Sequence, residues 1–338
     1  MFPFHIPRKR RLTQLALLGL AGLLSGPALP QAEAPPLTTT ALPNLGDGSD
    51  LTPAAERRIG DRIAQQLYRD PDYIDDPVLT DYVQGIWQPL LAAARQRGEL
   101  TAQLDEAFAW DVLMGRDRTV NAFALPGGYF GLHLGLVGMV TSRDELASVL
   151  AHELSHVTQR HISRSMSRQA AQAPWLMGAM VLGILAASKD PGAGQAAIVG
   201  GQAAAVQSQL NYSRDMEREA DRIGFGVQSQ AGFAPQGFVS MFEKLQQSNR
   251  LNDYGGFPYL RSHPLTTERM SDMQSRVRQS DKASVSPATT LEHAMVAARA
   301  RVLSNAAVDA MRIWAEEVQP ANLAKLPAAA QVGSLYGA

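Results

Sequence analysis

Residues 152–156 read His-Glu-Leu-Ser-His, and this spacing can bind a metal ion. On a helix, side chains four positions apart project from the same face, so His152 and His156 can reach one ion. Glu153 lies beside them and can take a proton from the attacking water. Zinc lowers the pKa of water that binds to it to about 7. The motif therefore predicts hydrolysis that needs one Zn²⁺ ion per chain, with His152 and His156 as ligands and Glu153 as general base.

A solvated helix face is the alternative explanation of this motif. The neighbouring residues Val149, Leu150 and Val157 are apolar, which predicts that this part of the helix is buried. Burying charged side chains is costly unless a metal ion or a partner compensates them. The apolar neighbours therefore favour the metal site.

A catalytic zinc ion needs a third protein ligand and an open fourth position. Because the sequence has no cysteine, that ligand must be His, Asp or Glu. Glu217 is the best candidate, because Asp221 shares its helix face and could accept a hydrogen bond from the outer nitrogen of a zinc-bound histidine. Glu219 is the competing ligand but points away from that row. The alternative is a surface helix in which neighbouring arginines pair with these acids.

Three other histidines have no predicted part in the metal site. By helical phase, His161 falls off the metal face, and we expect a solvated or packing side chain. His133 lies in a predicted strand, where packing is the expected role. His293 is expected at the surface.

The elements that would position these residues are mostly helices. Helices are predicted on both sides of a break at Asp75-Asp76-Pro77, over 141–167, over 213–230, after Pro235 and over 291–317. The 141–167 helix begins with a capping box of Ser142 and Glu145. Strands are predicted over 107–114 and 129–134, with a turn at Pro126-Gly127-Gly128. We expect an α+β fold that is mainly helical, with a small β-sheet beside the metal-binding helix.

The N-terminus predicts export. A basic start at 8–11 and an apolar run over 15–24 are typical of a signal peptide, while a membrane anchor is the alternative for so short a run. We expect a cleaved signal over 1–34, an N-terminal arm over 35–50, a periplasmic location and at most peripheral membrane contact. The apolar segment 174–206 predicts a packed helical hairpin, or a segment that touches a membrane.

Composition narrows the class of function. The formal net charge of −1 argues against a nucleic-acid partner, which needs a basic surface. Without cysteine we expect no disulfide, thiolate zinc site or lipoprotein anchor. A hydrophobic fraction of 45% is enough for a packed core.

Four motifs together resemble one family. The 152–156 motif, the Glu-x-x-Ala-Asp helix at 217–221, the His263-Pro264 pair and the string 121–128 are similar to the zinc metallopeptidase family that includes HtpX and the CAAX prenyl endopeptidase. The resemblance covers roughly residues 43–275. It implies a gluzincin-type peptidase domain, which we place at 51–285, followed by a short helical segment at 286–338. It also implies that His152, His156 and Glu217 bind zinc and that Glu153 is the general base.

The resemblance extends to His263 and Arg269, which match a histidine and an arginine of the family. His263 could stabilise the oxyanion of the reaction, or it could occupy the open position of the zinc ion and hold the enzyme latent. Without the resemblance it would be an ordinary loop histidine. Arg269 is expected to support the ligands from outside.

An extended substrate is expected to add to the edge of the small sheet. The candidate substrate-binding residues are Asn121, Ala122, Phe123, Gly127 and Gly128.

The resemblance implies cleavage of unfolded or misassembled envelope proteins, in outer-membrane protein assembly and quality control. Outer-membrane assembly machinery is an expected partner. The alternative is a chaperone or assembly factor whose zinc site is latent or structural. Exported relatives carry a tetratricopeptide array after the peptidase domain, and the residues after 285 amount to at most the start of one.

Overall fold

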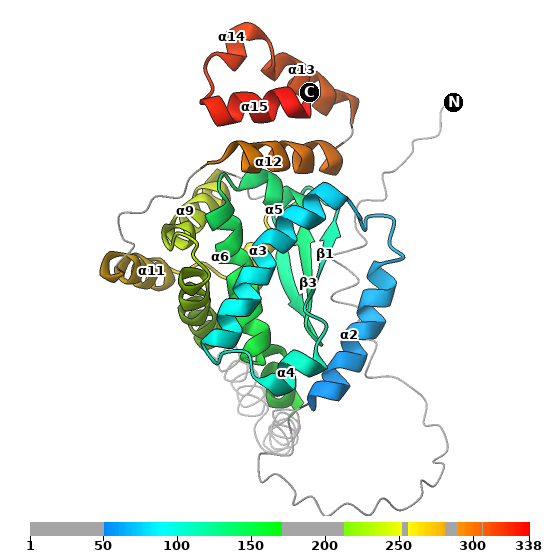
Figure 1. Cartoon of the computed structure of the whole chain (residues 1–338), viewed down its shortest axis with the longest axis vertical. Helices are drawn as coiled ribbons and strands as arrows, with labels where there is room; N and C mark the ends of the chain where they lie inside the picture. The colour runs from blue at the N-terminus through cyan, green and yellow to red at the C-terminus, as the bar shows by residue number, and fades with distance from the viewer. Residues whose placement is uncertain (1–50, 171–212, 252–255, 281–288, 306) are drawn as a thin grey trace, which may run out of the picture. The chain divides into compact units, whose positions relative to one another are not determined.

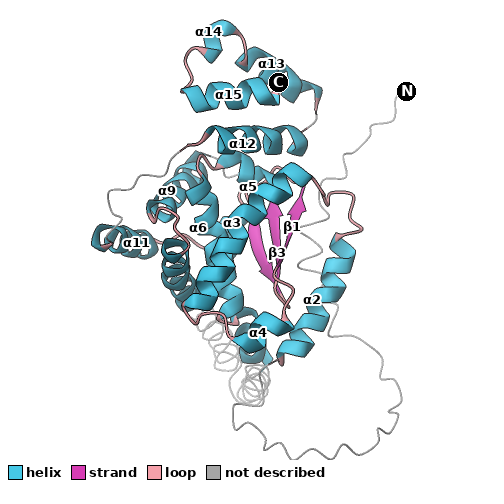
Figure 2. Ribbon diagram, viewed as in Figure 1, coloured by secondary structure: helices cyan, strands magenta, loops and turns pink. Residues whose placement is uncertain are grey.

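The computed structural model describes residues 51–170, 213–251, 256–280, 289–305 and 307–338 (Figure 1). The described residues are mainly helical and include one small three-stranded sheet, as Figure 2 shows. The expected α+β class, mainly helical, is therefore confirmed at this level. The expected signal segment, N-terminal arm and hairpin over 174–206 lie outside the described residues.

Two capped helices open the described chain. Helix α2 (Pro53–Leu67) follows the cap residue Thr52, and helix α3 (Pro77–Gln96) follows Asp76. The Asp76 carboxylate accepts a hydrogen bond from the Leu79 N–H at 3.0 Å, which satisfies an amide that has no partner within the helix. The predicted break before Pro77 is confirmed.

The sheet has strands β1 (Asp111–Gly115), β2 (Ala122–Leu125) and β3 (Tyr129–His133) in the order β1-β3-β2. Strand β3 pairs in parallel with β1 and antiparallel with β2. Gly127 and Gly128 form the turn between β2 and β3, with φ of 76° and 78°, which other residues adopt at a cost. The predicted turn is confirmed.

The predicted strand boundaries were wrong at two ends. Helix α4 (Ala102–Ala107) and a short connection precede β1, so the strand begins at Asp111 rather than at 107. Strand β3 ends at His133, because Leu134 opens helix α5 (Leu134–Met139). Apolar residues of a short helix and a buried strand give similar patterns, and only packing separates them.

The two faces of the sheet pack on different helices. Phe130 of β3 faces the main core, where its ring lies 4.6 Å from that of Trp87 on α3. The preceding residue, Tyr129, faces a smaller cluster with Ala64 of α2. This alternation follows from the two-residue period of a strand. In the order β1-β3-β2, β2 lies at one edge of the sheet and contacts α6.

Helix α6 (Arg143–Thr158) carries the 152–156 motif. Ser142 accepts a hydrogen bond from the Glu145 N–H, while the Glu145 carboxylate accepts one from the N–H of Thr141 rather than of Ser142. The prediction of one helix over 141–167 was wrong. Arg160 has a φ of 55°, and a second helical stretch begins at residue 161.

The helical residues 213–230 cross α6 at close range. A Cβ atom on Gly224 would lie 3.0 Å from the carbonyl oxygen of Ala151, so a larger residue would push the two helices apart. Gly232, with φ of 92°, follows this helix. Helix α9 (Gln236–Leu251) packs against α6, and α10 (Tyr259–Ser262) and α11 (Thr267–Gln279) follow.

The C-terminal elements are α12 (Leu291–Ser304), α13 (Val308–Glu317), α14 (Pro320–Leu323) and α15 (Ala328–Gly337). The prediction of one helix over 291–317 was wrong, because α12 ends at Ser304. Helix α12 packs between α5 and α15. No helix among the described residues is long and apolar enough to cross a membrane.

His293 corrects another expectation. It was expected at the surface, but it is 1% exposed. Its ring lies between the Tyr82 hydroxyl at 2.6 Å and the Val140 carbonyl oxygen at 3.0 Å. It therefore joins α12 to α3 and to the end of α5.

Candidate metal centre

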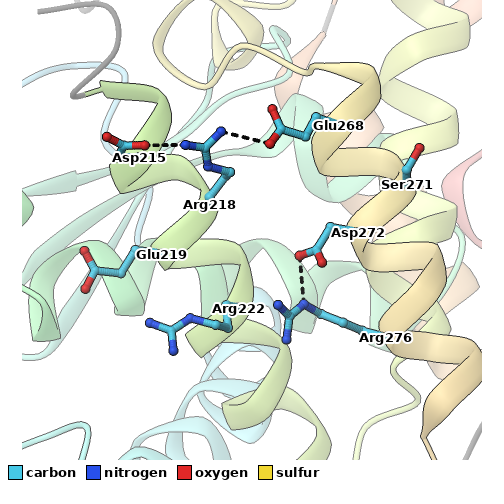
Figure 3. Close-up of a pocket in the computed structure, with 8 residues that line it drawn as sticks. All are labelled: Asp215, Arg218, Glu219, Arg222, Glu268, Ser271, Asp272 and Arg276. Atoms are coloured by element: carbon cyan, nitrogen blue, oxygen red, sulfur yellow. Dashed lines mark hydrogen bonds and ion pairs between the residues drawn. The ribbon is translucent and has the colours of Figure 1, made fainter. Parts of the chain in front are cut away.

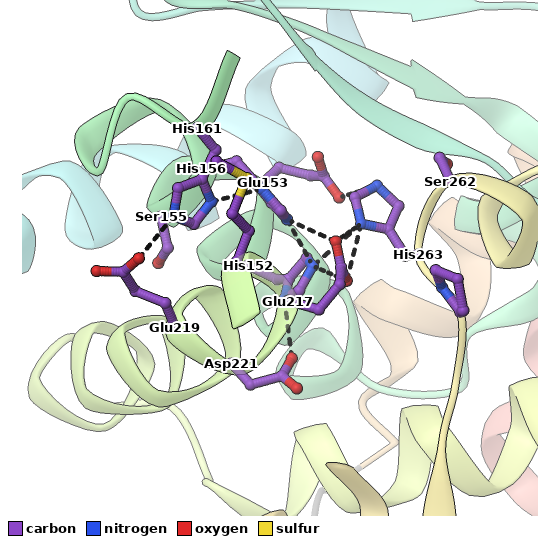
Figure 4. A network of polar contacts seen from close by, with 12 residues as sticks. His152, Glu153, Ser155, His156, His161, Glu217, Glu219, Asp221, Ser262 and His263 are labelled. Carbon is purple, nitrogen blue, oxygen red and sulfur yellow. Dashed lines mark hydrogen bonds and ion pairs between the residues drawn. The ribbon is translucent and has the colours of Figure 1, made fainter. Parts of the chain in front are cut away.

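Four side chains from three parts of the chain converge on one point. His152 and His156 come from α6, Glu217 from the helix over 213–230, and His263 from the residue that follows α10. Each offers one ligand atom, and these atoms lie within 4.8 Å of one another (Figure 4). All four residues are buried. The arrangement could hold one metal ion.

The two imidazoles of α6 face the centre with the same atom. Their Nε2 atoms lie 3.0 Å apart, because residues four positions apart stack on one helix face. The Glu217 carboxylate lies 3.3 Å from Nε2 of His152 and 3.4 Å from Nε2 of His156. The structure thus brings together the three residues that the sequence proposed as ligands.

A second layer of charged groups lies behind these side chains. The outer nitrogen of His152, Nδ1, lies 3.0 Å from the Asp221 carboxylate. Arg269 donates two hydrogen bonds to Asp221, at 2.6 and 2.8 Å, and its guanidinium also lies 2.9 Å from Glu217. One buried arginine therefore holds both carboxylates in place.

This environment shifts the pKa values of the carboxylates. Burial alone would raise the pKa of Glu217, but His263 and His152 outweigh it and hold that pKa well below its ordinary value. Burial likewise opposes ionisation of Asp221, but Arg269 and His152 keep its pKa low. Both carboxylates are therefore ionised beside the imidazole nitrogens.

The two histidines of α6 differ in their pKa values. Burial would lower the pKa of His152, but the nearby carboxylates of Asp221 and Glu217 outweigh burial and raise it to about 10. Burial, with the neighbouring His152, moves the pKa of His156 well below its ordinary value. The carboxylates that contact His152 therefore favour a positive charge on its ring.

Glu153 is the least satisfied group near the centre. Both of its carboxylate oxygens are buried and make no hydrogen bond within the described part of the chain. Nε2 of His263, at 3.4 Å, is its ion-pair neighbour. A buried carboxylate without hydrogen bonds is costly and needs a compensating cation or ligand. Two imidazoles and a carboxylate are the usual donors of a catalytic zinc site. These donors and the buried Glu153 carboxylate fit a zinc ion.

His263 lies within the cluster rather than beside it. Its Nδ1 lies 3.3 Å from Nε2 of His152 and 3.1 Å from the Glu217 carboxylate. Its ring stacks on Tyr259, with centroids 4.6 Å apart and an interplanar angle of 28°. Tyr259 therefore fixes the plane of the ring that faces the ligands.

His161 differs from the solvated alternative, because it is 3% exposed. Its Nδ1 lies 2.9 Å from Nδ1 of His156, and its Nε2 lies 3.1 Å from the Glu219 carboxylate. The turn at Arg160 changes the helical phase, so the prediction of one regular helix through residue 161 could not place His161 against His156. Glu219 has no ligand atom in the four-residue cluster.

The candidate substrate-binding residues fall into two groups. Asn121 and Ala122 are buried at the start of β2, and the ring of Phe123 lies over Gly131 of β3. Gly127 and Gly128 lie in the turn at the other end of β2 and approach the backbones of α2 and of residues 108–110. The positive φ and the close packing of the turn explain why glycine occupies both positions. Contact of these glycines with substrate stays a prediction.

Fold and centre together define a buried site with the donors of a catalytic metal centre. The sequence model of peptidase family M48 matches residues 86–277, and the chain belongs to that family. The family agrees with the broader resemblance drawn from the motifs.

Several curated proteins are similar to this chain. It is 38% identical over 272 residues to the putative beta-barrel assembly-enhancing protease of Vibrio cholerae, covering 80% of this chain and 53% of that protein. It is 36% identical over 242 residues to the beta-barrel assembly-enhancing protease of Escherichia coli, covering 70% of this chain and 47% of that protein. It is 27% identical over 196 residues to the mitochondrial metalloendopeptidase OMA1 of Saccharomyces cerevisiae, covering 56% of this chain and 54% of that protein. The chain thus spans about half the length of these relatives.

Proposed function

We propose that this chain is a zinc-dependent metalloendopeptidase that hydrolyses peptide bonds of unfolded or misassembled envelope proteins. The observation that carries the proposal is the buried Glu153 carboxylate, which makes no hydrogen bond within the described residues and lies beside the His152–His156–Glu217 cluster. A structural metal site would have no use for such a group. Membership in peptidase family M48 supports the reaction class.

His152, His156 and Glu217 would hold the zinc ion. When bound, zinc would act as a Lewis acid on the substrate carbonyl and would make the attacking water more acidic. Asp221 orients the His152 ring through its outer nitrogen, and Arg269 holds Asp221. Such outer partners fix the tautomer and orientation of a ligand histidine.

Glu153 would move the proton of the reaction. Its carboxylate would accept a proton from the attacking water and would then deliver that proton to the leaving nitrogen of the peptide bond. Glu153 makes no hydrogen bond within the described chain; its Oε1 lies 3.4 Å from Nε2 of His263, and its Oε2 is left available for this transfer.

The edge of β2 would bind the extended substrate. The His133 N–H donates to the Asn121 carbonyl, and the antiparallel register continues this pairing through Phe123 and Gly131. In such a ladder every second residue directs its backbone groups to the other side. Ala122 and Ala124 therefore present their N–H and C=O groups at the outer edge, where a peptide could add as a strand.

The cellular setting rests on the relatives and on the N-terminal sequence. The printed names of bacterial relatives refer to beta-barrel assembly, which supports envelope proteins as the substrate class. The signal-like residues 1–34 support a periplasmic location. Unfolded outer-membrane proteins as substrates and the outer-membrane assembly machinery as a partner are parts of this proposal.

A chaperone or assembly factor with a latent or structural zinc site is the second candidate. One observation favours it: His263 lies among the ligand atoms and could complete a four-ligand site. Four protein ligands are typical of structural zinc, whereas catalytic zinc keeps one position open. The same residue could instead leave the ligand position and stabilise the oxyanion.

Glu153→Gln tests the peptidase. We expect the variant to keep its zinc, while cleavage of casein or of an unfolded outer-membrane protein falls by about 10²–10⁴-fold, because an amide cannot accept the proton. Zinc content and cleavage are measured side by side with the wild type. Full cleavage by the variant would overturn the assignment of Glu153, and absence of zinc from the wild type would overturn the metal site.

His263→Ala separates the two candidates. If His263 blocks the open position, as its place among the ligands suggests, the variant gains cleavage activity and X-ray absorption shows one nitrogen ligand fewer than in the wild type. A loss of about 10²–10³-fold would instead assign His263 to oxyanion stabilisation. Unchanged activity and unchanged coordination would make His263 an ordinary loop residue.

A further inference from the structure

The two histidines of the motif have different partners at their outer nitrogens. Nδ1 of His152 faces a carboxylate, that of Asp221, at 3.0 Å. Nδ1 of His156 faces a third imidazole, with 2.9 Å to Nδ1 of His161 (Figure 4). The proposed mechanism gives His161 no role, although its contact with His156 is as short as the contact behind His152.

His161 is itself held from behind. Its Nε2 lies 3.1 Å from the Glu219 carboxylate, and the guanidinium of Arg164 lies 2.9 Å from the same carboxylate. The side chain of His161 is 3% exposed, so both ring nitrogens use protein partners within the described residues. Both nitrogens of this buried ring are therefore satisfied, one of them by His156 itself.

The positions of the hydrogens follow from the task of His156. If its Nε2 offers a lone pair to a metal ion, the ring hydrogen sits on Nδ1 and must be donated to an acceptor. The only ring atom of His161 in reach is Nδ1, which then has to be unprotonated. His161 therefore carries its hydrogen on Nε2 and donates it to Glu219. Each contact then has one donor and one acceptor.

We propose that His161 and Glu219 are positioning residues that fix the tautomer and orientation of His156 for metal binding. This proposal rests on the proposed zinc site and deepens it. The helical residues 213–230 then supply three acidic groups that position the two histidines: Glu217 as ligand, Asp221 behind His152, and Glu219, through His161, behind His156. One helix thus sets the orientation of both imidazoles.

The turn at Arg160 makes this contact possible. Arg160 has a φ of 55°, a costly conformation for a residue with a side chain. Its guanidinium bonds to the buried Glu56 carboxylate at 2.9 Å and to the carbonyl oxygen of Leu51. These bonds to the first turns of α2 and to Leu51 before it hold the turn that brings His161 back against His156.

The test measures metal binding by the full chain rather than cleavage. Zinc affinity is determined by competition with a chromophoric chelator, and the absorption spectrum of the cobalt(II)-loaded protein reports ligand geometry. We expect His161→Phe, which keeps a ring but no nitrogen, to weaken zinc binding by about 10–100-fold and to change the cobalt spectrum. His161→Gln can still accept from His156 and donate to Glu219, so it should restore part of the affinity.

Glu219→Gln provides the second variant, because Glu219 is partly exposed and its replacement spares the core. It should weaken zinc binding, because an amide oxygen is a weaker acceptor than a carboxylate. The effect should be smaller than that of His161→Phe, because the amide can still accept the hydrogen bond from His161. Asp215→Asn, an exposed acid on the same helix, is the control and should bind zinc like the wild type.

Three outcomes would overturn the proposal. Wild-type affinity and cobalt spectra in Glu219→Gln and in a folded His161→Phe would show that the contact does not orient His156. Lower thermal stability of the metal-free variants with unchanged zinc affinity would show a packing role. If the wild type binds no zinc, the proposed function is wrong as well. If the wild type binds zinc and the variants bind it equally well, only the positioning role of His161 and Glu219 is wrong.

Discussion

The buried and exposed faces of the helical residues 213–230 use the same types of charged side chain in different surroundings. On the exposed face, Arg218 pairs with Asp215 and with Glu268 of α11, beside a second pair of Arg276 with Asp272 (Figure 3). On the buried face, Arg269 of α11 pairs with Asp221 (Figure 4). Both faces meet α11, but only one contributes to the metal centre.

Burial separates the two sets of ion pairs. Arg269 and Asp221 are 4% and 1% exposed, whereas Arg218 and Glu268 are 45% and 67% exposed. Water screens the exposed pairs, so they add little to stability. A buried pair is costly to form and more costly to break, because one charge is then left alone. The surface helix that the sequence offered as an alternative thus describes one face only, and there Arg218 pairs with Asp215 and with Glu268 of α11 rather than with Glu217, Glu219 or Asp221.

Glu217→Ala should show the largest effect in this comparison. It removes a direct ligand, so we expect zinc affinity to fall by more than the roughly 100-fold that loss of an outer partner can cost. Asp215→Ala, an exposed acid on the same helix, should leave the affinity unchanged. Competition with a chelator measures both variants. Equal affinities would show that the third ligand lies elsewhere.

Arg269→Gln should show the next largest effect. The change leaves the carboxylates of Asp221 and Glu217 buried without their cation, so we expect the free energy of unfolding to fall by about 3–5 kcal/mol. Chemical denaturation of the zinc-free protein measures this change without interference from metal binding.

Arg218→Gln is the matched control on the exposed face and should show the smallest effect. Loss of its exposed pairs should cost about 1 kcal/mol or less, and less again in 1 M salt, because salt screens exposed charges. Similar losses in the Arg269 and Arg218 variants would show that burial does not control the energetics of these pairs.

Some features of this protein follow from neighbouring residues alone. The pattern His152-x-x-x-His156 places two imidazoles on one helix face whatever the rest of the chain does. Asp76 before Pro77 and Ser142 before α6 mark helix starts, because their side chains satisfy free amides locally. The turn at Gly127-Gly128 follows from the φ that glycine tolerates. The same local reasoning proposed Glu217 and Asp221 from their spacing of four.

Other features depend on contacts between segments far apart in the sequence. Arg160, which follows α6, has a positive φ that residues with a side chain disfavour, and Glu56 and the Leu51 backbone hold its side chain. His293 is a polar residue that we expected at the surface, but it is buried and contacts the Tyr82 hydroxyl and the Val140 carbonyl oxygen. Sequence patterns carry no signal for such partners, since each lies over a hundred residues away.

The sequence by itself determined which groups could bind a metal ion and which helices could carry them, because spacing on a helix is a local property. Only the tertiary structure decided which face of the 213–230 helix meets α6, through the close approach at Gly224. It likewise decided that His263 lies among the ligands and that His161 lies behind His156. Each of these depends on the packing of separate helices, which fixes distances that local rules of spacing leave open.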